Sequence, residues 1–565
     1  MKAMKNIVFL YAGFVQTHAF DMLFPKDFSA SPESGASARE KSAFALVLDW
    51  AKEIRDREKI VIAASRQTED KVRREILKAD MEGECAVIVE QGWSTILLLK
   101  RMAESASQYG ASCVIYSMAD RPFLDKSLTE SIMSDHVKYL SEYTFADGYP
   151  AGLSPEAVDS GALNIMLSLA SRKESFSTDR VSRESLFSVL REDINSFEIE
   201  TVIAPKDFRM LRLDFSCSSR AATIACVHLC RLAMEKGSSF DALSLAHLAA
   251  SSPDVQRTVP AFYNVQIAGN LSTTTIYNPY PEEFRKKYGC LPVKKENPQP
   301  VNMGLEQFKG LVDGMASLSE IAVVGLSGFS EPLTHPDFLE FVQTVLAKPG
   351  LSLLVETDGT LLTAPVAQKV ADIVKDSPDR TGSWPAVIWI VSVDAFSEET
   401  YCKVHTNAFT NANGLRSFDS AKSALVTLEK YFPGAVYPQF VRMKDNEDEL
   451  EKFYRFYHDA ESPCRGRLII QKYDSYCGLL PDLKSADLAP LERKPCWHCK
   501  RDMMILPDGS VPACREFVLE ADCGNVFTEG VDAVWKKMGG LAESHIQGEY
   551  PGKCGNCDEY YTFNF

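Results

Sequence analysis

The sequence lacks the features that mark several large classes of protein. No stretch of its 565 residues approaches the roughly 20 consecutive apolar residues that a membrane-spanning helix requires. It also lacks an excess of basic charge, because 61 lysines and arginines face 77 aspartates and glutamates, which leaves a net charge of −16. Since nucleic acids and anionic membrane surfaces attract basic proteins, we expect neither of them as a partner.

Cysteine is absent from the beginning of the chain and gathers towards its end. No cysteine precedes Cys85, and no A-x-A-like site follows the first apolar run, IVFLYAG, so we interpret this run as a buried strand and not as a signal peptide. The 15 cysteines are odd in number and are spread over a long chain. This pattern is typical of a cytoplasmic protein with a metal site, and not of a secreted disulfide scaffold.

The chain is long enough for about three domains of ~100 to 200 residues. In its first part, the apolar runs IVFLYAG, KIVIAAS, ECAVIVEQG and SCVIYSMAD alternate with polar segments of helical character. Such alternation predicts an α/β fold with a doubly wound sheet. We predict domains over residues 1–255, 256–480 and 481–565.

The fourth apolar run ends in Asp120, within ADRPFLD, and a helical segment separates it from YTFADGYPAGLSPE. These stretches resemble the cytidylyltransferase-like branch of the nucleotidyltransferases. The resemblance implies that Asp120 holds Mg²⁺ against a nucleotide phosphate, a role that suits a hard oxygen ligand. Asp147 is a second candidate for the same role.

The Gly-rich phosphate loop of that family is not intact in this sequence. After the first strand, YAGFVQTHAF keeps only Gly13, and the later stretch SGASAREKS offers Gly35, Arg39 and Lys41 at an unusual distance. The N-terminal domain is therefore expected to have a nucleotidyltransferase-like fold. Its alternatives are nucleotidyl transfer, sugar or nucleotide binding without turnover, and docking.

In the middle of the chain, an apolar run ends in the turn GFSEPLTHPDF. Glycine lets the backbone approach a ligand closely, and proline stiffens the turn behind the glutamate, although a stiff strand-to-helix connection would look the same. The turn resembles the Gly-Gly-Glu-Pro motif with which radical S-adenosylmethionine (SAM) enzymes meet the amino group of SAM. The cofactor-binding residues that this resemblance implies are Gly328, Ser330, Glu331, Pro332 and, from a later strand, Asp394.

Further strand-like runs follow this turn, at residues 353–362, 387–396 and 437–456, and helical segments separate them. The pattern predicts parallel strands with crossover helices, that is, a partial βα barrel of the TIM type. The order and spacing of the runs resemble the barrel strands of the radical SAM family. ETDGT stands where that family often has TNGT, and VSVDA, which contains Asp394, stands where it often has SxD.

The first barrel strand should lead into a Cys-x3-Cys-x2-Cys loop, which holds the SAM-cleaving cluster of the family. Aligning the Tyr-Asn-Pro of this stretch with the family's Tyr-Cys-Pro puts Leu271, Thr275 and Asn278 at the three ligand positions. A [4Fe-4S] cluster needs thiolates, and nearby Cys290 supplies one at most. We therefore expect that the chain has lost the cluster that delivers the electron for SAM cleavage.

The last hundred residues are rich in cysteine. Cys496 is followed after twelve residues by Gly509 and after four more by Cys514, while Cys554 and Cys557 form a closing Cys-x2-Cys pair. The Asp-Gly turn of MMILPDGSVPAC predicts a hairpin that places Cys514 opposite Cys496. The segment resembles the SPASM domain, the auxiliary iron-sulfur extension of many radical SAM peptide modifiers, and implies one [4Fe-4S] cluster on these four cysteines.

Zinc is the competing interpretation of the cysteine-rich segment. Two Cys-x2-Cys pairs, Cys496 with Cys499 and Cys554 with Cys557, suit tetrahedral Zn²⁺ equally well. The sequence does not decide between the two metals. The remaining late cysteines are interpreted as spare ligands, at Cys499 and Cys523, or as structural thiols, at Cys464 and Cys477.

The order of the three predicted domains resembles the spirochaete-type SPASM proteins. Two function classes follow from this resemblance. The first is a radical SAM/SPASM enzyme that acts on a peptide or a nucleotide- or sugar-linked substrate, or a nucleotidyltransferase. The second is a degenerate, non-catalytic iron-sulfur scaffold that pairs with an intact radical SAM homologue. The cofactors implied are one [4Fe-4S] cluster, SAM, and Mg²⁺ in the N-terminal domain, and the sequence identifies no catalytic residue.

Overall fold

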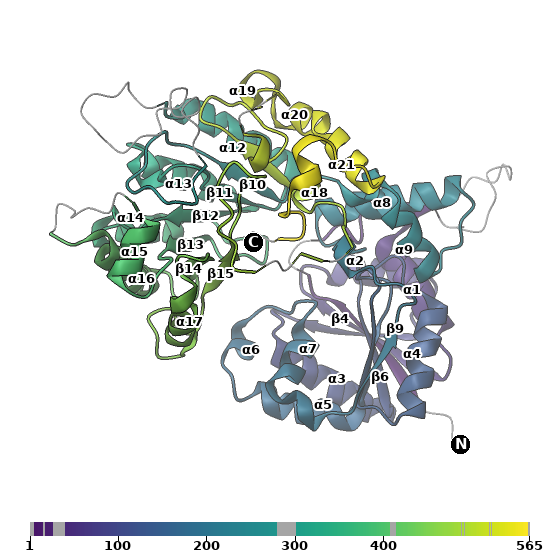
Figure 1. Cartoon of the computed structure of the whole chain (residues 1–565). Coiled ribbons are helices and arrows are strands. Elements are labelled where there is room, and N and C mark those ends of the chain that lie inside the picture. Colours follow the sequence, from purple (N-terminus) through teal and green to yellow (C-terminus); the bar gives the residue numbers. More distant parts are fainter. Residues whose placement is uncertain are drawn as a thin grey trace. The chain divides into compact units, whose positions relative to one another are not determined.

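A computed structural model shows two compact units, residues 1–258 and 259–565 (Figure 1). The residues described are 5–14, 17–25, 40–279, 301–406, 414–486, 489–490, 492–518, 520 and 522–562. Gly35, Arg39 and Cys290 lie outside them. The predicted second and third domains share the second unit.

A seven-stranded sheet forms the centre of the first unit, in the order β5-β4-β1-β6-β8-β7-β9. Strands β5, β4, β1 and β6 run parallel, and β8 is antiparallel to both β6 and β7. The strands are β1 (Asn6–Ala12), β4 (Arg57–Ser65), β5 (Cys85–Glu90), β6 (Cys113–Met118), β7 (Tyr143–Asp147), β8 (Glu156–Asp159) and β9 (Ile199–Ile203), with a separate pair β2 (Leu23–Pro25) and β3 (Glu40–Ser42). The four predicted apolar runs are β1, β4, β5 and β6, so these strand predictions are confirmed.

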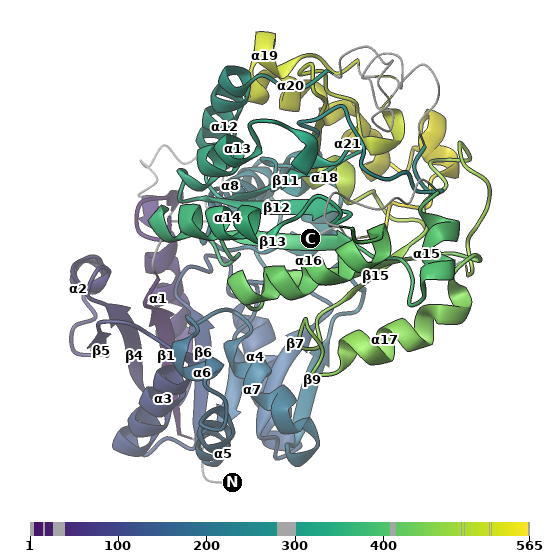
Figure 2. The ribbon, with the colours of Figure 1, turned by 90° about the vertical axis from the view of Figure 1, so that its left-hand side faces the viewer.

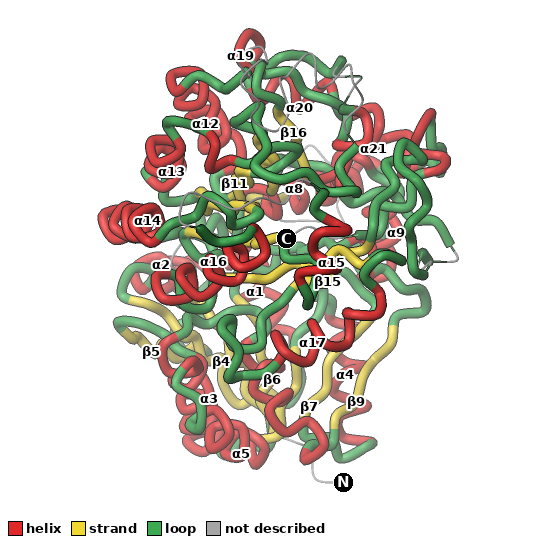
Figure 3. The backbone as a smooth tube through the Cα atoms, turned by 60° about the vertical axis from the view of Figure 1, so that its left-hand side comes forward, coloured by secondary structure: helices red, strands yellow, loops and turns green. Residues whose placement is uncertain are grey.

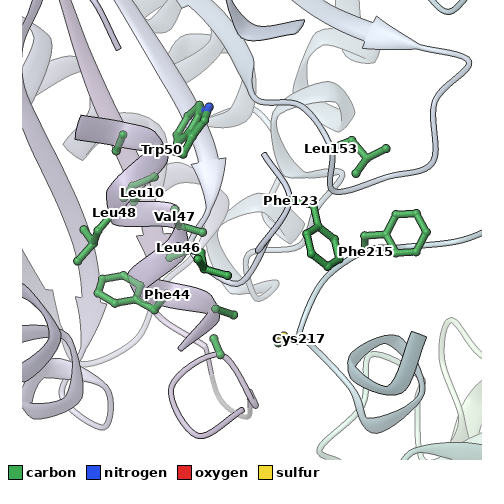
Figure 4. Close-up of a cluster of buried hydrophobic side chains, with 14 of the residues drawn as sticks. Leu10, Phe44, Leu46, Val47, Leu48, Trp50, Phe123, Leu153, Phe215 and Cys217 are labelled. Atoms are coloured by element: carbon green, nitrogen blue, oxygen red, sulfur yellow. The ribbon is translucent and has the colours of Figure 1, made fainter. Parts of the chain in front are cut away.

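Helices cover both faces of this sheet (Figures 1 and 3). They are α1 (Ala43–Glu53), α2 (Glu69–Lys78), α3 (Thr95–Tyr109), α4 (Lys126–Lys138), α5 (Ser160–Ala170), α6 (Ser175–Thr178), α7 (Ser185–Leu190), α8 (Arg220–Glu235), α9 (Ala242–Ala250) and α10 (Pro253–Gln256). Val8 and Leu10 belong to the core cluster that contains α1, part of which Figure 4 shows, whereas Ile7 and Phe9 belong to the cluster on the other face. A strand buried on both faces is a continuous apolar run, which is why IVFLYA shows no alternation.

The second unit is built on a half-barrel of parallel strands, in the order β15-β14-β13-β12-β11-β10-β16 (Figure 2). The strands are β10 (Phe262–Val265), β11 (Ala322–Leu326), β12 (Leu351–Thr357), β13 (Val387–Ser392), β14 (Val436–Arg442), β15 (Ile469–Lys472) and β16 (Asp502–Ile505). The helices are α12 (Leu305–Ser319), α13 (Phe338–Leu346), α14 (Ala364–Asp376), α15 (Glu398–Val404), α16 (Ser417–Tyr431) and α17 (Leu450–His458), then α18 (His498–Arg501), α19 (Val526–Glu529), α20 (Val531–Lys537) and α21 (Gly539–Ile546). The predicted partial βα barrel is confirmed.

The hairpin predicted for MMILPDGSVPAC is wrong. Its first half is β16, which pairs in parallel with β10 and so extends the half-barrel sheet. The Asp-Gly turn is present, with φ of +82° at Gly509, and the N–H of Leu506 donates a hydrogen bond of 3.0 Å to Ser510 O. After the turn, Val511 pairs with Cys523 and Gly524 and does not continue a hairpin strand. An unpaired edge at β10 is the stronger template for β16 because it offers a full row of backbone partners.

Crossing a bilayer requires a long apolar helix. No helix within the described ranges meets this requirement.

Candidate iron-sulfur centre and barrel cavity

The carboxyl ends of the half-barrel strands surround a cavity of about 160 Å³, named here the barrel cavity. Parallel strands bring their C-terminal side chains to one edge, where folds of this kind bind ligands. Five strands each contribute at least one polar side chain to the wall, among them Asn264, Glu356, Ser392, Gln439 and Gln471. Two residues earlier on the same strands lie apolar side chains of one cluster: Phe262, Leu354, Ile390, Tyr437 and Ile469. This alternation is visible in the sequence, although we did not predict a polar layer from it.

The three positions that the alignment assigns to cluster ligands all line the barrel cavity. Leu271 is buried in an apolar cluster with Phe329. Thr275 forms an isolated β-bridge with His405, and the N–H of Asn278 donates to Thr275 O at 3.2 Å. The structure therefore brings these three side chains to one site, but none of them carries the sulfur that iron in such a cluster needs.

Hydrogen bonds tie the loop that contains these positions to the ends of neighbouring strands. Ser272 and Thr273 donate their hydroxyls to Asp358 Oδ2, at 2.5 and 2.7 Å, just beyond β12. Tyr277 donates its hydroxyl to Asp394 Oδ2 at 2.7 Å, beyond β13. The protein itself thus fixes the loop with buried, charge-assisted hydrogen bonds, which are stronger than neutral ones.

Asp394 lies at the centre of this arrangement. It is fully buried, and its φ of +57° is strained for a residue with a side chain. Besides the Tyr277 hydroxyl it accepts the N–H of Val441 at 2.7 Å, and His405 Nε2 lies 3.1 Å from Oδ2. Burial raises the pKa of Tyr277 well above its usual value, so the phenol stays protonated as a donor. Sequence reasoning missed His405, because no motif links it to Asp394.

Glu331, the predicted SAM-binding acid, is buried and engaged within the protein. Its Oε1 accepts the N–H of Leu333 at 3.1 Å and the hydroxyl of Thr357 at 2.9 Å, and its Oε2 accepts the N–H of Asp358 at 3.0 Å. Burial, with the nearby Asp358 carboxylate, raises the pKa of Glu331 to about 8. The carboxyl group that was expected to face a ligand therefore also holds the end of β12.

The other residues of the predicted turn keep the geometry expected of it. Gly328 has a φ of +102°, which favours glycine, and it lines the barrel cavity together with Ser330. Pro332 begins a short 3₁₀ helix, Pro332–Thr334. Gly328, Ser330, Glu331 and the loop positions therefore share one cavity wall.

A second, smaller cavity of about 30 Å³ lies among the late cysteines and is named here the cysteine cavity. Its wall contains all four predicted ligands and one predicted spare: Cys496, Cys514, Cys554, Cys557 and Cys499. Cys523 and Cys464 are not part of this wall. Cys477, interpreted from the sequence as structural, places its thiol within hydrogen-bonding reach of Cys557 and 3.8 Å from Glu516 Oε2.

The surroundings of the cysteine cavity favour negative charge on some of its sulfurs. A hydrogen bond from the Cys499 thiol lowers the pKa of Cys496 to about 6 against the effect of burial, and His498 adds to the lowering. Burial opposes protonation of His498, but its 2.6 Å bond to Asp502 raises its pKa to about 9. Arg493 and Arg515 also line the cavity. These cations complement the charge that metal-bound thiolates carry.

The spacing of the sulfurs bears on the choice of metal. Tetrahedral zinc with Zn–S bonds of about 2.3 Å needs its sulfurs within about 4 Å of one another. Over the described ranges, the only group of three or more ligand atoms found within 4.8 Å of one another is Asp474, Asp558 and Glu559. Lys472 bonds to two of these acids, and no cysteine belongs to the group. Among the described cysteines, no three sulfurs therefore lie in so compact a group.

In the first unit, the predicted Mg²⁺ ligand Asp120 is completely buried just beyond β6. The Nη2 of Arg183 lies 2.8 Å from its Oδ2. Asp147, the second candidate, is partly exposed, accepts the N–H of Gly148 at 2.7 Å and forms an ion pair of 3.1 Å with Arg209. The structure does not bring Asp120 and Asp147 into one hydrogen-bonded group.

Residues 496–558 match the profile of the SPASM domain, described as an iron-sulfur cluster-binding domain. The class defined by fold and site is thus a protein with a SPASM-like segment attached to a parallel half-barrel. A Treponema pallidum (strain Nichols) protein named "Uncharacterized protein" is 36% identical over 381 residues, which are 67% of this chain and 98% of that protein. The chain belongs to the same family as this Treponema pallidum protein.

Two solved structures show a weak similarity to parts of this chain. A cytidylyltransferase from Leptospira borgpetersenii serovar Hardjo-bovis is 14% identical and covers 45% of this chain and 96% of its own, with a TM-score of 0.33. Streptococcus suis SuiB, bound to precursor peptide SuiA, is 11% identical and covers 54% of this chain and 71% of its own, with a TM-score of 0.38. At these values neither similarity bears on function.

Proposed function

We propose that this chain is a radical SAM/SPASM-type protein that holds one [4Fe-4S] cluster on Cys496, Cys514, Cys554 and Cys557 and does not cleave SAM. The observation that carries the proposal is the convergence of these four thiols, which are far apart in the sequence, on one small cavity. The match of residues 496–558 to an iron-sulfur cluster-binding domain supports an iron-sulfur cluster over zinc. A bound cluster would supply one-electron transfer.

The roles of neighbouring residues follow from their contacts. His545 Nδ1 accepts the N–H of Cys496 at 3.2 Å, and Cys557 Sγ accepts the N–H of Glu559 at 3.4 Å. Such hydrogen bonds orient the chain around the ligands and tune a cluster. Arg515 follows Cys514 directly and lines both cavities, so its charge acts on each of them.

The barrel cavity, on this proposal, binds a ligand without SAM cleavage. Leu271, Thr275 and Asn278 offer no thiolate, so a cluster at this position would lack its protein ligands. Glu331 retains only weak capacity for the amino group of SAM, because both of its oxygens already accept hydrogen bonds. The polar wall suits a peptide or a nucleotide- or sugar-linked ligand, whose many polar groups need partners.

A second candidate is an active radical SAM enzyme whose cleaving cluster comes from an intact homologue. The turn with Gly328 and Glu331 supports this candidate, since Gly328 has a positive φ and Pro332 follows Glu331 in a short 3₁₀ helix, as in the Gly-Gly-Glu-Pro motif that this turn resembles. The first proposal and this candidate predict the same SPASM cluster. They differ in whether SAM is cleaved when the homologue is present.

Anaerobic reconstitution with iron and sulfide tests the proposal. We expect about four iron atoms and four sulfides per chain, as one [4Fe-4S] cluster requires. Iron near eight per chain, or stoichiometric zinc with no iron, would refute it. Formation of 5'-deoxyadenosine with dithionite, first by the chain alone and then with an intact homologue, separates the two candidates.

A further inference from the structure

A buried arginine occupies the position at Asp120 where the nucleotidyltransferase resemblance predicts a divalent ion. Arg183 belongs to the segment between α6 and α7, and its Nη2 lies 2.8 Å from Asp120 Oδ2. Its Nε lies 3.1 Å from Asp214 Oδ2. One guanidinium therefore bridges two carboxylates, as a divalent cation at this place would.

The guanidinium already engages one oxygen of each carboxylate, beside which a hydrated metal ion would have to bind. Asp120 has no exposed surface. Mg²⁺ requires near-octahedral oxygen ligands at 2.0–2.1 Å and gives up its waters reluctantly. The second oxygens, Asp120 Oδ1 and Asp214 Oδ1, are buried without a hydrogen-bond partner, and so is the Nη1 of Arg183. A water molecule suits such a group of polar atoms better than a second cation beside Arg183.

The electrostatics of the group also favour the guanidinium. Burial raises the pKa of Asp120, and Arg183 opposes this rise. The same two carboxylates, against the effect of burial, raise the pKa of Arg183 above its already high value, so its charge is permanent. Without Arg183, the buried carboxylate of Asp120 and the partly exposed carboxylate of Asp214 would lose their shared ion pair and would need another cation.

A second, independent observation concerns the place of the expected phosphate loop, beyond β1. The ring of Tyr11 packs edge-on against Phe14 and Trp93, with ring centroids 5.6 and 5.9 Å apart. The indole of Trp93 donates to Ala64 O at 2.9 Å. Lys41, one of the residues expected to meet phosphate, is paired with Asp49. Just beyond the first strand, Gly13 thus lies against Trp93 and Phe14 against Tyr11 in one aromatic cluster.

We propose that Arg183 replaces the divalent cation at Asp120, so that the first unit is a metal-independent domain and does not carry out Mg²⁺-dependent nucleotidyl transfer. The guanidinium fixes Asp120 and Asp214 in the geometry that a metal ion would otherwise impose. The Mg²⁺ site predicted from the sequence is therefore replaced by an internal ion pair. This inference is independent of the iron-sulfur cluster in the second unit.

Binding of Mn²⁺ to the full chain, followed by electron paramagnetic resonance of the free ion, tests the proposal. The unaltered chain and Asp120→Asn should bind Mn²⁺ equally, because Asp120 holds no metal. Arg183→Met should gain one Mn²⁺ per chain, since its two carboxylates then need a cation. The double variant Arg183→Met, Asp120→Asn should lose that site, and Arg183→Lys, which keeps the charge, should not gain it.

Several outcomes would overturn the proposal. One is a Mn²⁺ site in the unaltered chain that Asp120→Asn removes. Another is an Arg183→Met variant that melts cooperatively and yet gains no site. If Arg183→Met does not fold, calorimetry with CTP on the unaltered chain decides the matter, because we expect the same heat with and without Mg²⁺. A Mg²⁺-dependent increment that is absent from Asp120→Asn would refute the proposal.

Discussion

The barrel cavity and the cysteine cavity belong to the same compact unit, yet their walls differ in secondary structure and in the side chains that form them. Around the barrel cavity, the loop after β10 is held by side-chain hydrogen bonds to strand ends, as those of Thr273 and Tyr277 show. Around the cysteine cavity the secondary structure is short, with α18 and α19 of four residues each, and the shared feature is sulfur. From this comparison we expect the loop at the barrel cavity to fold without a metal, and the segment around the cysteine cavity to depend on a bound metal group.

Removing one cluster ligand should have the largest effect. We expect Cys514→Ala to lose essentially all of its iron, because three thiolates rarely retain a closed cluster. Iron and sulfide analysis with the visible absorption spectrum measures the loss. The matched control is Cys523→Ala, which removes a thiol outside the cavity wall and should keep about four iron atoms. Equal iron in both variants would contradict the assigned ligand set.

Introducing thiolates at the three loop positions should create a second cluster site at the barrel cavity. We expect the triple variant Leu271→Cys, Thr275→Cys, Asn278→Cys to raise the iron content from about four to about eight atoms. It should also form 5'-deoxyadenosine from SAM with dithionite, which the unaltered chain should not do. Formation of 5'-deoxyadenosine by the unaltered chain would contradict the prediction that the barrel cavity, unlike the cysteine cavity, holds no cluster.

The free energy of unfolding should depend on pH through Glu331, which lines the barrel cavity. Its pKa rises from 4.5 to about 8 in the folded protein. The stability contributed by its neutral form is thus fully present below pH 4.5 and is lost as pH rises towards 8. Compared with Glu331→Gln, the unaltered chain should lose about 1.4 kcal/mol of unfolding free energy for each pKa unit crossed.

Urea unfolding of both proteins between pH 5 and 8, with the cluster kept oxidised and anaerobic, measures this difference. Glu130→Gln, which changes an exposed carboxylate in the first unit, is the control and should follow the unaltered chain. Parallel curves for Glu331→Gln and the unaltered chain would show that Glu331 is ionised in the folded state throughout.

The smallest effect is expected from a single hydrogen bond of the barrel loop. Tyr277→Phe removes the 2.7 Å bond to Asp394 and should cost about 1.5 to 3 kcal/mol of unfolding free energy, as bonds to charged groups do. Tyr454→Phe, at an exposed tyrosine, should change stability by less than about 0.5 kcal/mol. A cost equal to that of the control would mean that this bond does not hold the loop.

Much of the fold could be predicted from the sequence, because strands buried on both faces or followed by helices leave local patterns. The runs that became β1, β6, β12 and β13 are examples. The hairpin after β16 could not be predicted correctly, since its local turn signal competes with pairing to β10, more than 200 residues earlier. Local turn chemistry determines the bend but not the partner strand.

Part of the candidate site could be predicted in the same way. The cysteine cavity brings together Cys496, Cys514 and the closing pair, which the resemblance to the SPASM domain implied as ligands, and Gly328 has a positive φ in the turn before Glu331. The roles of His405 and Cys477 could not be predicted, because they depend on contacts with Asp394 and Cys557, which no motif connects to them.

The amino-acid sequence by itself determined which residue types are present at the two candidate metal sites: thiols at one, and leucine, threonine and asparagine at the other. Only the tertiary structure decided which partner each charged group and each hydrogen-bond donor has. It paired Asp120 with Arg183, 63 positions later, and engaged both oxygens of Glu331 with the end of β12. The physical reason is that burial makes an unpaired polar group costly, so the nearest partner in space, and not in sequence, fixes what each group can do.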